Sequence, residues 1–254
     1  MSTTISALRT FPTLASMEAR LLTREWAAMV FAFVFPPLMM LVLAGVFGNT
    51  PDPEFGGVKP TDYYVSAYLG IPIGALTLVG LPMMLASYRE RGVLRRFEAF
   101  GVSTGRVVAA QAVVTFGLIV LAAGLVLAAA APVYGIPTVQ DPAQVVIGWL
   151  AGAVTMTILG VALGLVAPTA RAAQALGLLT FMPMWLLGGG GPPRGVMTST
   201  MQHIGDVMPL WHASAALREP WLGTEGIGDN LVWLGGWALV GIVAIVVLLR
   251  RHPS

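Results

Sequence analysis

The sequence predicts an all-α integral membrane protein with six transmembrane helices. Of its 254 residues, 56% are hydrophobic and only 10% are charged, whereas an ordinary soluble domain carries about 25% charged residues. Six stretches lack Asp, Glu, Lys and Arg altogether, and each is close to the roughly 20 helical residues that cross a bilayer core. Because these stretches are continuously apolar, helices are favoured over barrel strands, which alternate. The six expected spans are 26–47, 65–87, 107–131, 145–167, 172–191 and 231–249.

The distribution of charge predicts the topology. Basic residues are retained on the cytoplasmic side of a membrane, and eleven of the fourteen Arg and Lys residues fall in the first, third, fifth and last connecting segments. These eleven are Arg9, Arg20, Arg24, Arg89, Arg91, Arg95, Arg96, Arg106, Arg171, Arg250 and Arg251. Both termini are therefore expected in the cytoplasm. Sparse lysine with abundant Ala, Gly and Arg suggests a bacterial protein. It is therefore expected in the cytoplasmic membrane, in contact with membrane lipid. No nucleic-acid partner is expected.

The elements at the N-terminus follow from periodicity and proline. Leu14, Met17 and Leu21 share one helical face, so residues 1–25 are expected to form an interfacial helix that leads into the first span. Within that span, Pro36 and Pro37 remove backbone donors and should kink the helix near mid-membrane.

The segment 88–106 is the most informative connection. On a helix, Val93, Leu94, Phe97 and Phe100 fall within one arc, so a short amphipathic cytoplasmic helix is expected. Two interpretations carry equal weight. Either a basic loop rests its apolar stripe on lipid headgroups, or a docking helix presents aromatic side chains to a soluble partner.

The fourth and fifth spans and the segment that follows them carry glycine and proline signals. Gly148, Gly152, Gly160 and Gly164 form small-xxx-small steps in the fourth span, which favour close helix packing. The fifth span contains Pro183 and ends in four glycines followed by two prolines, so a regular helix should end there. Residues 192–230 are unusually apolar for an outside loop. They are expected to dip back as short helices, with an interfacial loop carrying headgroup-level tryptophans as the alternative.

The sequence also lacks the residues of several function classes. Zero cysteines and three scattered histidines give no disulfide and no metal-ligand spacing. The only lysine, Lys59, precedes a proline and cannot belong to a phosphate-binding loop. No span contains a charged residue, which argues against a proton relay or an ion-coupled carrier. Gln111 and Gln174 are the most polar span residues, and each is expected to make a helix-packing hydrogen bond or to lie at an interface. A transporter of this kind needs a passive gradient or a separate energised subunit.

Two strings match a known family. The string RERGVLRRFEAFGVSTG, from Arg89 to Gly105, resembles the cytoplasmic coupling helix of ABC type-2 permeases. The string PMWLLGGGGPP from Pro183, followed by IGDVMPLWHASAALREPWLG from Ile204, is similar to that family's fifth span and outer segment. One departure is the run of four glycines, where many relatives carry Leu-Ser-Gly and bulky residues. The resemblance covers nearly the whole chain, as one domain over 1–254.

The resemblance implies a bacterial ABC exporter subunit of the drug-resistance type. The chain would pair with a second permease copy, identical or a paralogue, and with an ATP-binding cassette subunit that binds ATP and Mg²⁺, so no cofactor and no catalytic residue is expected in this chain. The coupling region would comprise Glu90, Arg91, Gly92, Leu94, Arg95, Arg96, Phe97 and Phe100. The outer gate would contain Pro209, His212 and Arg218. In this family the second and fifth spans line the cavity, which suggests Met83, Met84, Phe181, Met182, Met184 and Trp185 as lining side chains for a hydrophobic or amphipathic cargo.

Three other functions stay open at this stage. A polysaccharide or polymer exporter would show aromatic rings along a polar channel, and these spans are mostly Ala, Leu, Val, Gly and Met. A membrane-embedded lipid-modifying enzyme would be active without any ATPase. A passive scaffold would show neither property.

Overall fold

The computed structural model describes residues 16, 20 and 26–251. The expected interfacial helix over 1–25 therefore lies almost wholly outside the described residues. Within the described part the chain is helical without a β-strand, and six of its helical segments are long and apolar enough to cross a membrane. The all-α membrane fold expected from the sequence is confirmed.

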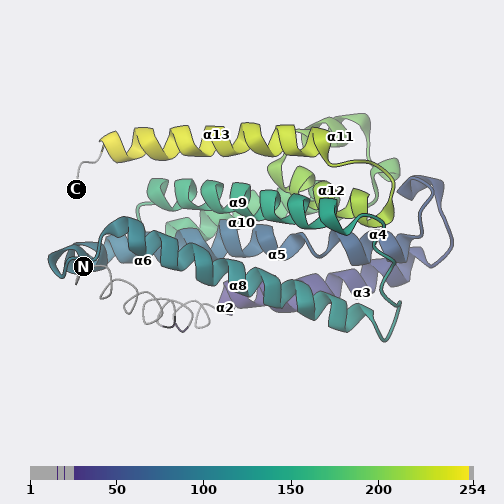
Figure 1. The fold of residues 1–254 in the computed structure, drawn as a ribbon, viewed down its shortest axis with the longest axis horizontal. Coiled ribbons are helices and arrows are strands. Elements are labelled where there is room, and N and C mark those ends of the chain that lie inside the picture. Colours follow the sequence, from purple (N-terminus) through teal and green to yellow (C-terminus); the bar gives the residue numbers. More distant parts are fainter. Residues whose placement is uncertain (1–15, 17–19, 21–25, 252–254) are drawn as a thin grey trace.

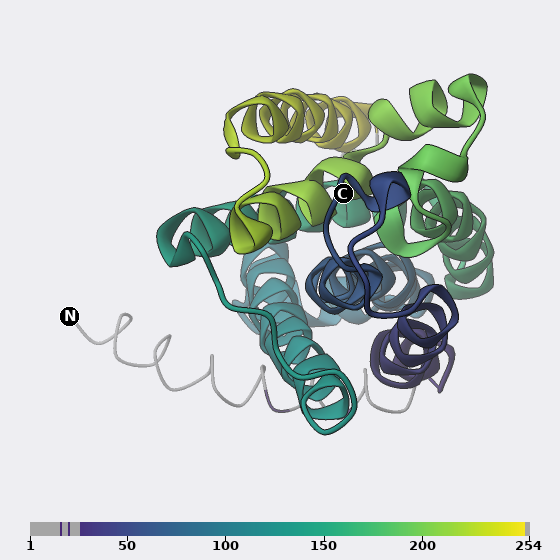
Figure 2. The same ribbon diagram turned by 90° about the vertical axis from the view of Figure 1, so that its right-hand side faces the viewer.

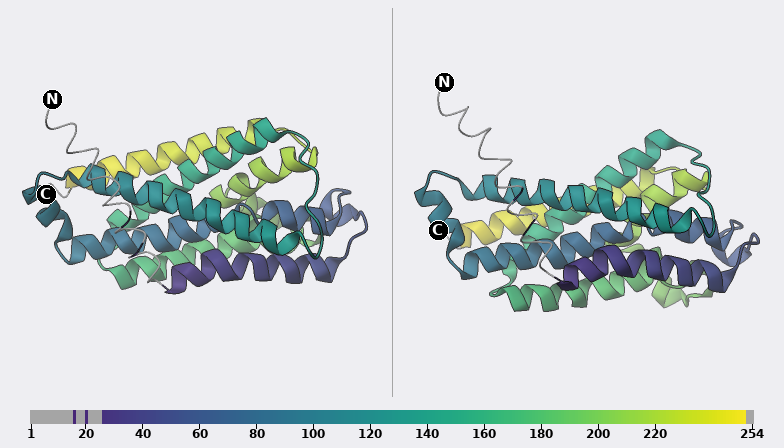
Figure 3. Two further views of the ribbon diagram at one scale, coloured as in Figure 1. Left: turned by 60° about the horizontal axis from the view of Figure 1, so that its bottom comes forward. Right: turned by 90° about the horizontal axis from the view of Figure 1, so that it is seen from below.

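The spans run roughly along one axis and form a single bundle (Figure 1, Figure 3). The first comprises α2 (Trp26–Met29), η1 (Val30–Val34) and α3 (Phe35–Phe47), and the second α4 (Pro60–Ala67), α5 (Ile71–Ala75), η3 (Leu76–Gly80) and α6 (Leu81–Glu90). The others are α8 (Thr104–Ala130), α9 (Pro142–Val166), α10 (Ala170–Trp185) with η4 (Leu186–Gly190), and α13 (Gly228–Arg251). Two short helices, α7 (Val93–Ala99) and α12 (Pro209–Leu222), lie at opposite ends, which we call the α7 end and the α12 end.

The second span is the centre of the bundle. Its most apolar window is wholly buried, whereas the corresponding windows of the other spans are 11% to 39% buried. It contacts the first span through α4, the third through α6, the fourth through α6 and η3, and the fifth through α6 and η3. Figure 2 shows it enclosed by the other helices. The sequence predicted a span over 65–87, whereas the helical path begins at Pro60 and ends at Glu90.

Two spans contain a π-helical segment close to proline, and a third loses its helical geometry at Gly188 and Gly189. Val30–Val34 precedes Pro36 and Pro37, Leu76–Gly80 precedes Pro82, and Leu186–Gly190 follows Pro183. Proline lacks the N–H that an α-helix needs, so the neighbouring turn widens to rearrange its hydrogen bonds. The first span thus has a π-helical segment before its two prolines, where the sequence predicted a kink near mid-membrane, and the second span has a similar segment that the apolar pattern did not indicate.

The glycines of α9 allow close helix contact. A Cβ on Gly148 would lie 2.0 Å from the carbonyl oxygen of Ala216 in α12, and one on Gly160 would lie 2.0 Å from the carbonyl oxygen of Thr77 in η3. Gly152 faces Ala213 of α12 in the same way, and Gly164 faces Leu85 of the second span. The small-residue steps thus bring the fourth span against both α12 and the second span.

The segment between the fifth and sixth spans folds back onto the bundle. After η5 (Arg194–Val196), α11 (Ser199–Asp206) begins at Thr198, whose hydroxyl accepts from the Met201 N–H at 3.4 Å. The 14-residue helix α12 then packs against α9, α13 and α4 and is buried along most of its length. A helix of that length spans about 21 Å, too short to cross a bilayer core. The short packed helices expected from the apolar residues of 192–230 are therefore present.

The α9–α12 contact yields a stability prediction. In Gly148→Ala the new methyl must push the α12 backbone away, and such overpacking costs about 1–3 kcal/mol. Gly124→Ala is the matched control, because Gly124 also lies inside a span, α8, and a Cβ there meets nothing within 4 Å. Thermal melting in detergent should show a loss for Gly148→Ala and none for Gly124→Ala. Equal melting temperatures would contradict the packing described here.

Candidate functional site

The helix α7 follows directly from the second span. Gly92 makes the turn in the left-handed region, with a φ of 65°, and α7 begins at the next residue. Val93, Leu94 and Phe97 pack against a buried cluster of Met84, Tyr88 and Val107. Much of the predicted apolar stripe is therefore used inside the chain, where it holds α7 against the ends of α6 and α8.

Phe100 is the exception in that stripe. It caps the C-terminal end of α7, and 86% of its surface is exposed. The side chains of Arg91, Arg95 and Arg96 are exposed on the same short segment. This segment outside the spans thus exposes an aromatic ring and three arginines, and both residue types are enriched at protein interfaces.

Two adjacent residues at the end of α6 bind the turn between α9 and α10. The Arg89 guanidinium donates to the carbonyl oxygens of Gly164 at 3.1 Å and Leu165 at 2.7 Å, at the C-terminal end of α9. The Glu90 carboxylate accepts from the Ala170 N–H at 3.0 Å, at the first residue of α10. Each charge suits its helix terminus, because helix C-termini favour cations and N-termini favour anions. We call this pair the Arg89–Glu90 clamp. Glu90, which the sequence placed in the coupling region, is thus bound within the chain.

The expected cavity residues divide into two groups. Met83, Met84 and Phe181 are at most 5% exposed and lie in the interior of the chain. Met182, Met184 and Trp185 are half-buried on α10. Their role as a lining stays a prediction.

The four-glycine turn after α10 is held by two tyrosines that the sequence analysis missed. Tyr64 donates to the Gly191 carbonyl at 3.0 Å, and Tyr68 donates to the Gly190 carbonyl at 2.6 Å. Gly189 has a φ of 90°, which disfavours any side chain, and a Cβ on Gly190 would lie 2.6 Å from the Trp185 ring. Only glycine fits this turn. The one available signal was the placement of two hydroxyls four residues apart in an apolar span.

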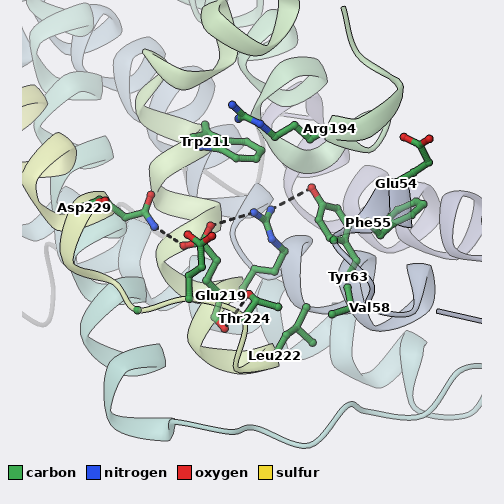
Figure 4. A pocket seen from close by; sticks show the side chains of 15 residues that line it. Glu54, Phe55, Val58, Tyr63, Arg194, Trp211, Glu219, Leu222, Thr224 and Asp229 are labelled. Atoms are coloured by element: carbon green, nitrogen blue, oxygen red, sulfur yellow. Dashed lines mark hydrogen bonds and ion pairs between the residues drawn. The ribbon is translucent and has the colours of Figure 1, made fainter. Parts of the chain in front are cut away.

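The α12 end contains a pocket of about 650 Å³ that Figure 4 shows from close by. Arg218, predicted for the outer gate, is 5% exposed and donates to the Tyr63 hydroxyl at 3.2 Å. Its guanidinium lies over the rings of Tyr63 and Trp211, at 4.5 and 5.0 Å from their centroids. The Glu219 carboxylate lies 3.6 Å away, so this buried cation is held by two rings and one carboxylate.

His212, also predicted for the outer gate, belongs to the same network. Its Nδ1 lies 2.9 Å from the Asn230 Oδ1, and its Nε2 lies 2.7 Å from the Asp206 carbonyl oxygen. Asn230 in turn donates to Glu219 at 2.6 Å. Each ring nitrogen of His212 therefore lies within hydrogen-bond distance of an oxygen atom. Pro209, the third predicted gate residue, occupies the first turn of α12, where its missing N–H is harmless.

The electrostatics of the pocket follow from burial and pairing. Burial raises the pKa of the Glu219 carboxyl above its ordinary value of 4.5, while the adjacent Arg218 opposes that shift. At the rim, Arg194 and Asp206 form a bidentate pair, and the hydrogen bonds from Arg194 lower the pKa of Asp206. Among the described residues no group of His, Cys, Asp and Glu is placed to hold a metal ion. The arrangement orders the α12 end and contains no nucleophile with an adjacent base.

Comparison with known families gives one match. A family model described as ABC-2 type transporter matches residues 9–220, which is most of the chain. None of the curated proteins matches the sequence.

The buried charges at the α12 end yield a prediction with a pH dependence. Arg218→Met leaves the Glu219 carboxylate buried without its cation, which should cost about 3 kcal/mol near pH 8. Because the folded-state pKa of Glu219 is raised, its protonation as pH falls through that pKa removes the buried charge, so the loss should shrink at acidic pH.

The matched control is the double variant Arg218→Met with Glu219→Gln, which removes both charges and keeps the acceptor for Asn230. Its melting temperature near pH 8 should exceed that of Arg218→Met alone. A loss that is the same for both variants and at every pH would contradict the electrostatic account.

Proposed function

Because this chain belongs to the ABC-2 type transporter family, and is the permease component of an ABC transporter, we propose that it moves a hydrophobic or amphipathic molecule outward across a bacterial cytoplasmic membrane. A separate ATP-binding cassette subunit binds ATP and Mg²⁺ and supplies the energy. Two permease copies, identical or paralogous, enclose the transport path, with the α7 end and both termini in the cytoplasm. The positive-inside bias supports that orientation, since Arg91, Arg95 and Arg96 lie at the α7 end.

The observation that carries the proposal is the exposed Phe100 in the same short segment as the exposed Arg91, Arg95 and Arg96. In the docking role this ring enters a pocket of the ATP-binding subunit, and the arginines pair with acidic groups around it. The bilayer-resting interpretation is less well supported, because Val93, Leu94 and Phe97 are already packed inside the chain. Residues 91–100 expose one aromatic ring, three arginines, Glu98 and Ala99, and this mixture suits a protein partner better than a lipid surface.

The Arg89–Glu90 clamp explains how motion of α7 reaches the membrane. Its two residues end α6, which is joined to α7 by the turn at Gly92, and they bind the ends of α9 and α10. A push on α7 therefore acts on the second, fourth and fifth spans together. Half-buried Met182, Met184 and Trp185 on α10 would then move with the second span, and flexible methionines suit a varied apolar cargo.

The docking surface can be tested with Phe100→Glu. The ring is 86% exposed, so folding and melting temperature should be unchanged, while capture of the ATP-binding subunit encoded beside the chain should fall at least tenfold. Ile136→Glu is the control, since Ile136 is 50% exposed in the connection between α8 and α9, at the α12 end. Co-purification measures both. Undiminished capture by Phe100→Glu would rule out this docking site.

The clamp can be tested with Arg89→Gln and Glu90→Leu, because leucine removes the acceptor for the Ala170 N–H. Both variants should still capture the ATP-binding subunit and hydrolyse ATP, but transport per ATP should fall at least tenfold, because α10 no longer follows α6. Arg89→Lys retains one charged donor and should lie between wild type and Arg89→Gln. Arg106→Gln, which removes an exposed arginine from the same end, serves as the control. Normal coupling in Arg89→Gln would refute the transmission role.

A further inference from the structure

The third span contains two buried polar side chains without a hydrogen-bond partner. Gln111 is 2% exposed and Thr115 is fully buried. Neither the amide nitrogen and oxygen of Gln111 nor the hydroxyl of Thr115 bonds to any residue that the structure describes. The helix-packing hydrogen bond expected for Gln111 is therefore absent from that part of the chain. Each such group costs about 1–3 kcal/mol when it is left unsatisfied.

The two residues form one polar site at membrane depth. They are four apart on α8 and so share a face one turn from each other. Thr115 lies about 16 Å from the start of α8 at Thr104, close to the middle of a hydrocarbon core about 30 Å thick. Along the same buried face the neighbours are apolar, namely Val107, Ala110, Ile119, Ala122 and Val126. Gln111 and Thr115 are thus the two polar residues of an otherwise apolar buried face of α8.

The spans that cover this face are irregular. The helix α8 packs against η1 of the first span and η3 of the second, both of which are π-helical. Such segments are weak points of a helix and concentrate at functional sites, because their hydrogen bonds can rearrange. By contrast, the span threonines Thr157 and Thr180 satisfy their hydroxyls within their own helices, at 2.7 Å from Ala153 and Leu176 carbonyls. An unsatisfied hydroxyl, as in Thr115, is therefore not a general property of the threonines in these spans.

We propose that Gln111 and Thr115 form a binding site for the polar group of an uncharged amphipathic cargo, which enters when the first and second spans move away from α8. This inference rests on the proposed transport function and narrows its cargo. The Gln111 amide offers a donor and an acceptor, and the Thr115 hydroxyl offers both. No charged residue lies within α8 after Arg106, so an ionised group would be desolvated there without a partner. The fitting ligand is a neutral hydroxyl or amide group with an apolar tail.

The binding test uses the complex with the ATP-binding subunit and 1-oleoylglycerol as the probe. This neutral lipid should stimulate ATP hydrolysis by the wild type, and methyl oleate, which has no donor, should not. The double variant Gln111→Leu with Thr115→Val should keep its partner and melt at the same or a higher temperature, because it loses unsatisfied groups. Its stimulation should nevertheless fall at least tenfold, whereas Thr157→Val should respond as the wild type does.

The possible outcomes distinguish two ligands that could satisfy Gln111 and Thr115, namely the polar group of a cargo and an internal water molecule. If the pair binds only an internal water, the double variant will respond to 1-oleoylglycerol as strongly as the wild type, and the proposal is overturned. A wild-type complex that ignores 1-oleoylglycerol also overturns it. Failure of the wild type to capture an ATP-binding subunit would instead contradict the proposed function itself, so the two failures are distinguishable.

A second measurement is independent of the cargo. The chain has no cysteine, so Thr115→Cys introduces a single thiol. N-Ethylmaleimide should label it at least tenfold faster during ATP turnover than without ATP, because labelling needs access from water. Ala122→Cys lies two turns further on the same face, is fully buried, and should stay unlabelled. Equal labelling of Thr115→Cys with and without ATP would show that the site does not open.

Discussion

The structure depends on the complete enclosure of its second span. In a bilayer every backbone polar group must be satisfied within the protein, and this span is interrupted by Pro72, Pro82 and a π-helical segment. A helix with such interruptions is tolerated where protein surrounds it. The glycines of α9 and α10 let other helices approach its backbone directly, since a Cβ on Gly177 would lie 2.2 Å from the Leu78 carbonyl oxygen. Close contact replaces the side-chain packing that longer residues would provide.

The second and fifth spans are joined at both ends by polar contacts. At the α7 end the Glu90 carboxylate binds the start of α10, and at the α12 end Tyr64 and Tyr68 bind the glycine turn that follows it. Gly177 brings the two spans together between these points. Sliding of one span along the other would break these hydrogen bonds, of which the two from Tyr64 and Tyr68 are buried. These contacts are the mechanical basis of the coupling between α7 and the membrane interior that is proposed above.

Composition and charge were sufficient to predict the six spans, because both reflect the cost of placing polar groups in lipid. They were insufficient for contacts that join distant residues. The resemblance placed Glu90 in the coupling region, and only the structure shows that its carboxylate also binds the N–H of Ala170, eighty residues away. The sequence analysis missed Tyr64 and Tyr68. In an apolar segment a tyrosine counts as a hydrophobic residue, and only the structure shows which carbonyl accepts from its hydroxyl. The gate residues His212 and Arg218 were identified through resemblance, and only the structure shows that Glu219 and Asn230 connect them.

The polar groups of the bundle differ in how well they are satisfied, and that difference separates structural from functional roles. Three charged side chains at the two ends, those of Arg89, Glu90 and Glu219, have partners at 2.6 to 3.6 Å, so their role in holding helices is evident from the contacts. Gln111 and Thr115 contribute no such contact and lower the stability of the resting state. Groups that cost stability without positioning anything are expected where a ligand or a conformational change uses them. A transport path needs such a place, because a site fully satisfied by the protein would have nothing to offer a passing cargo.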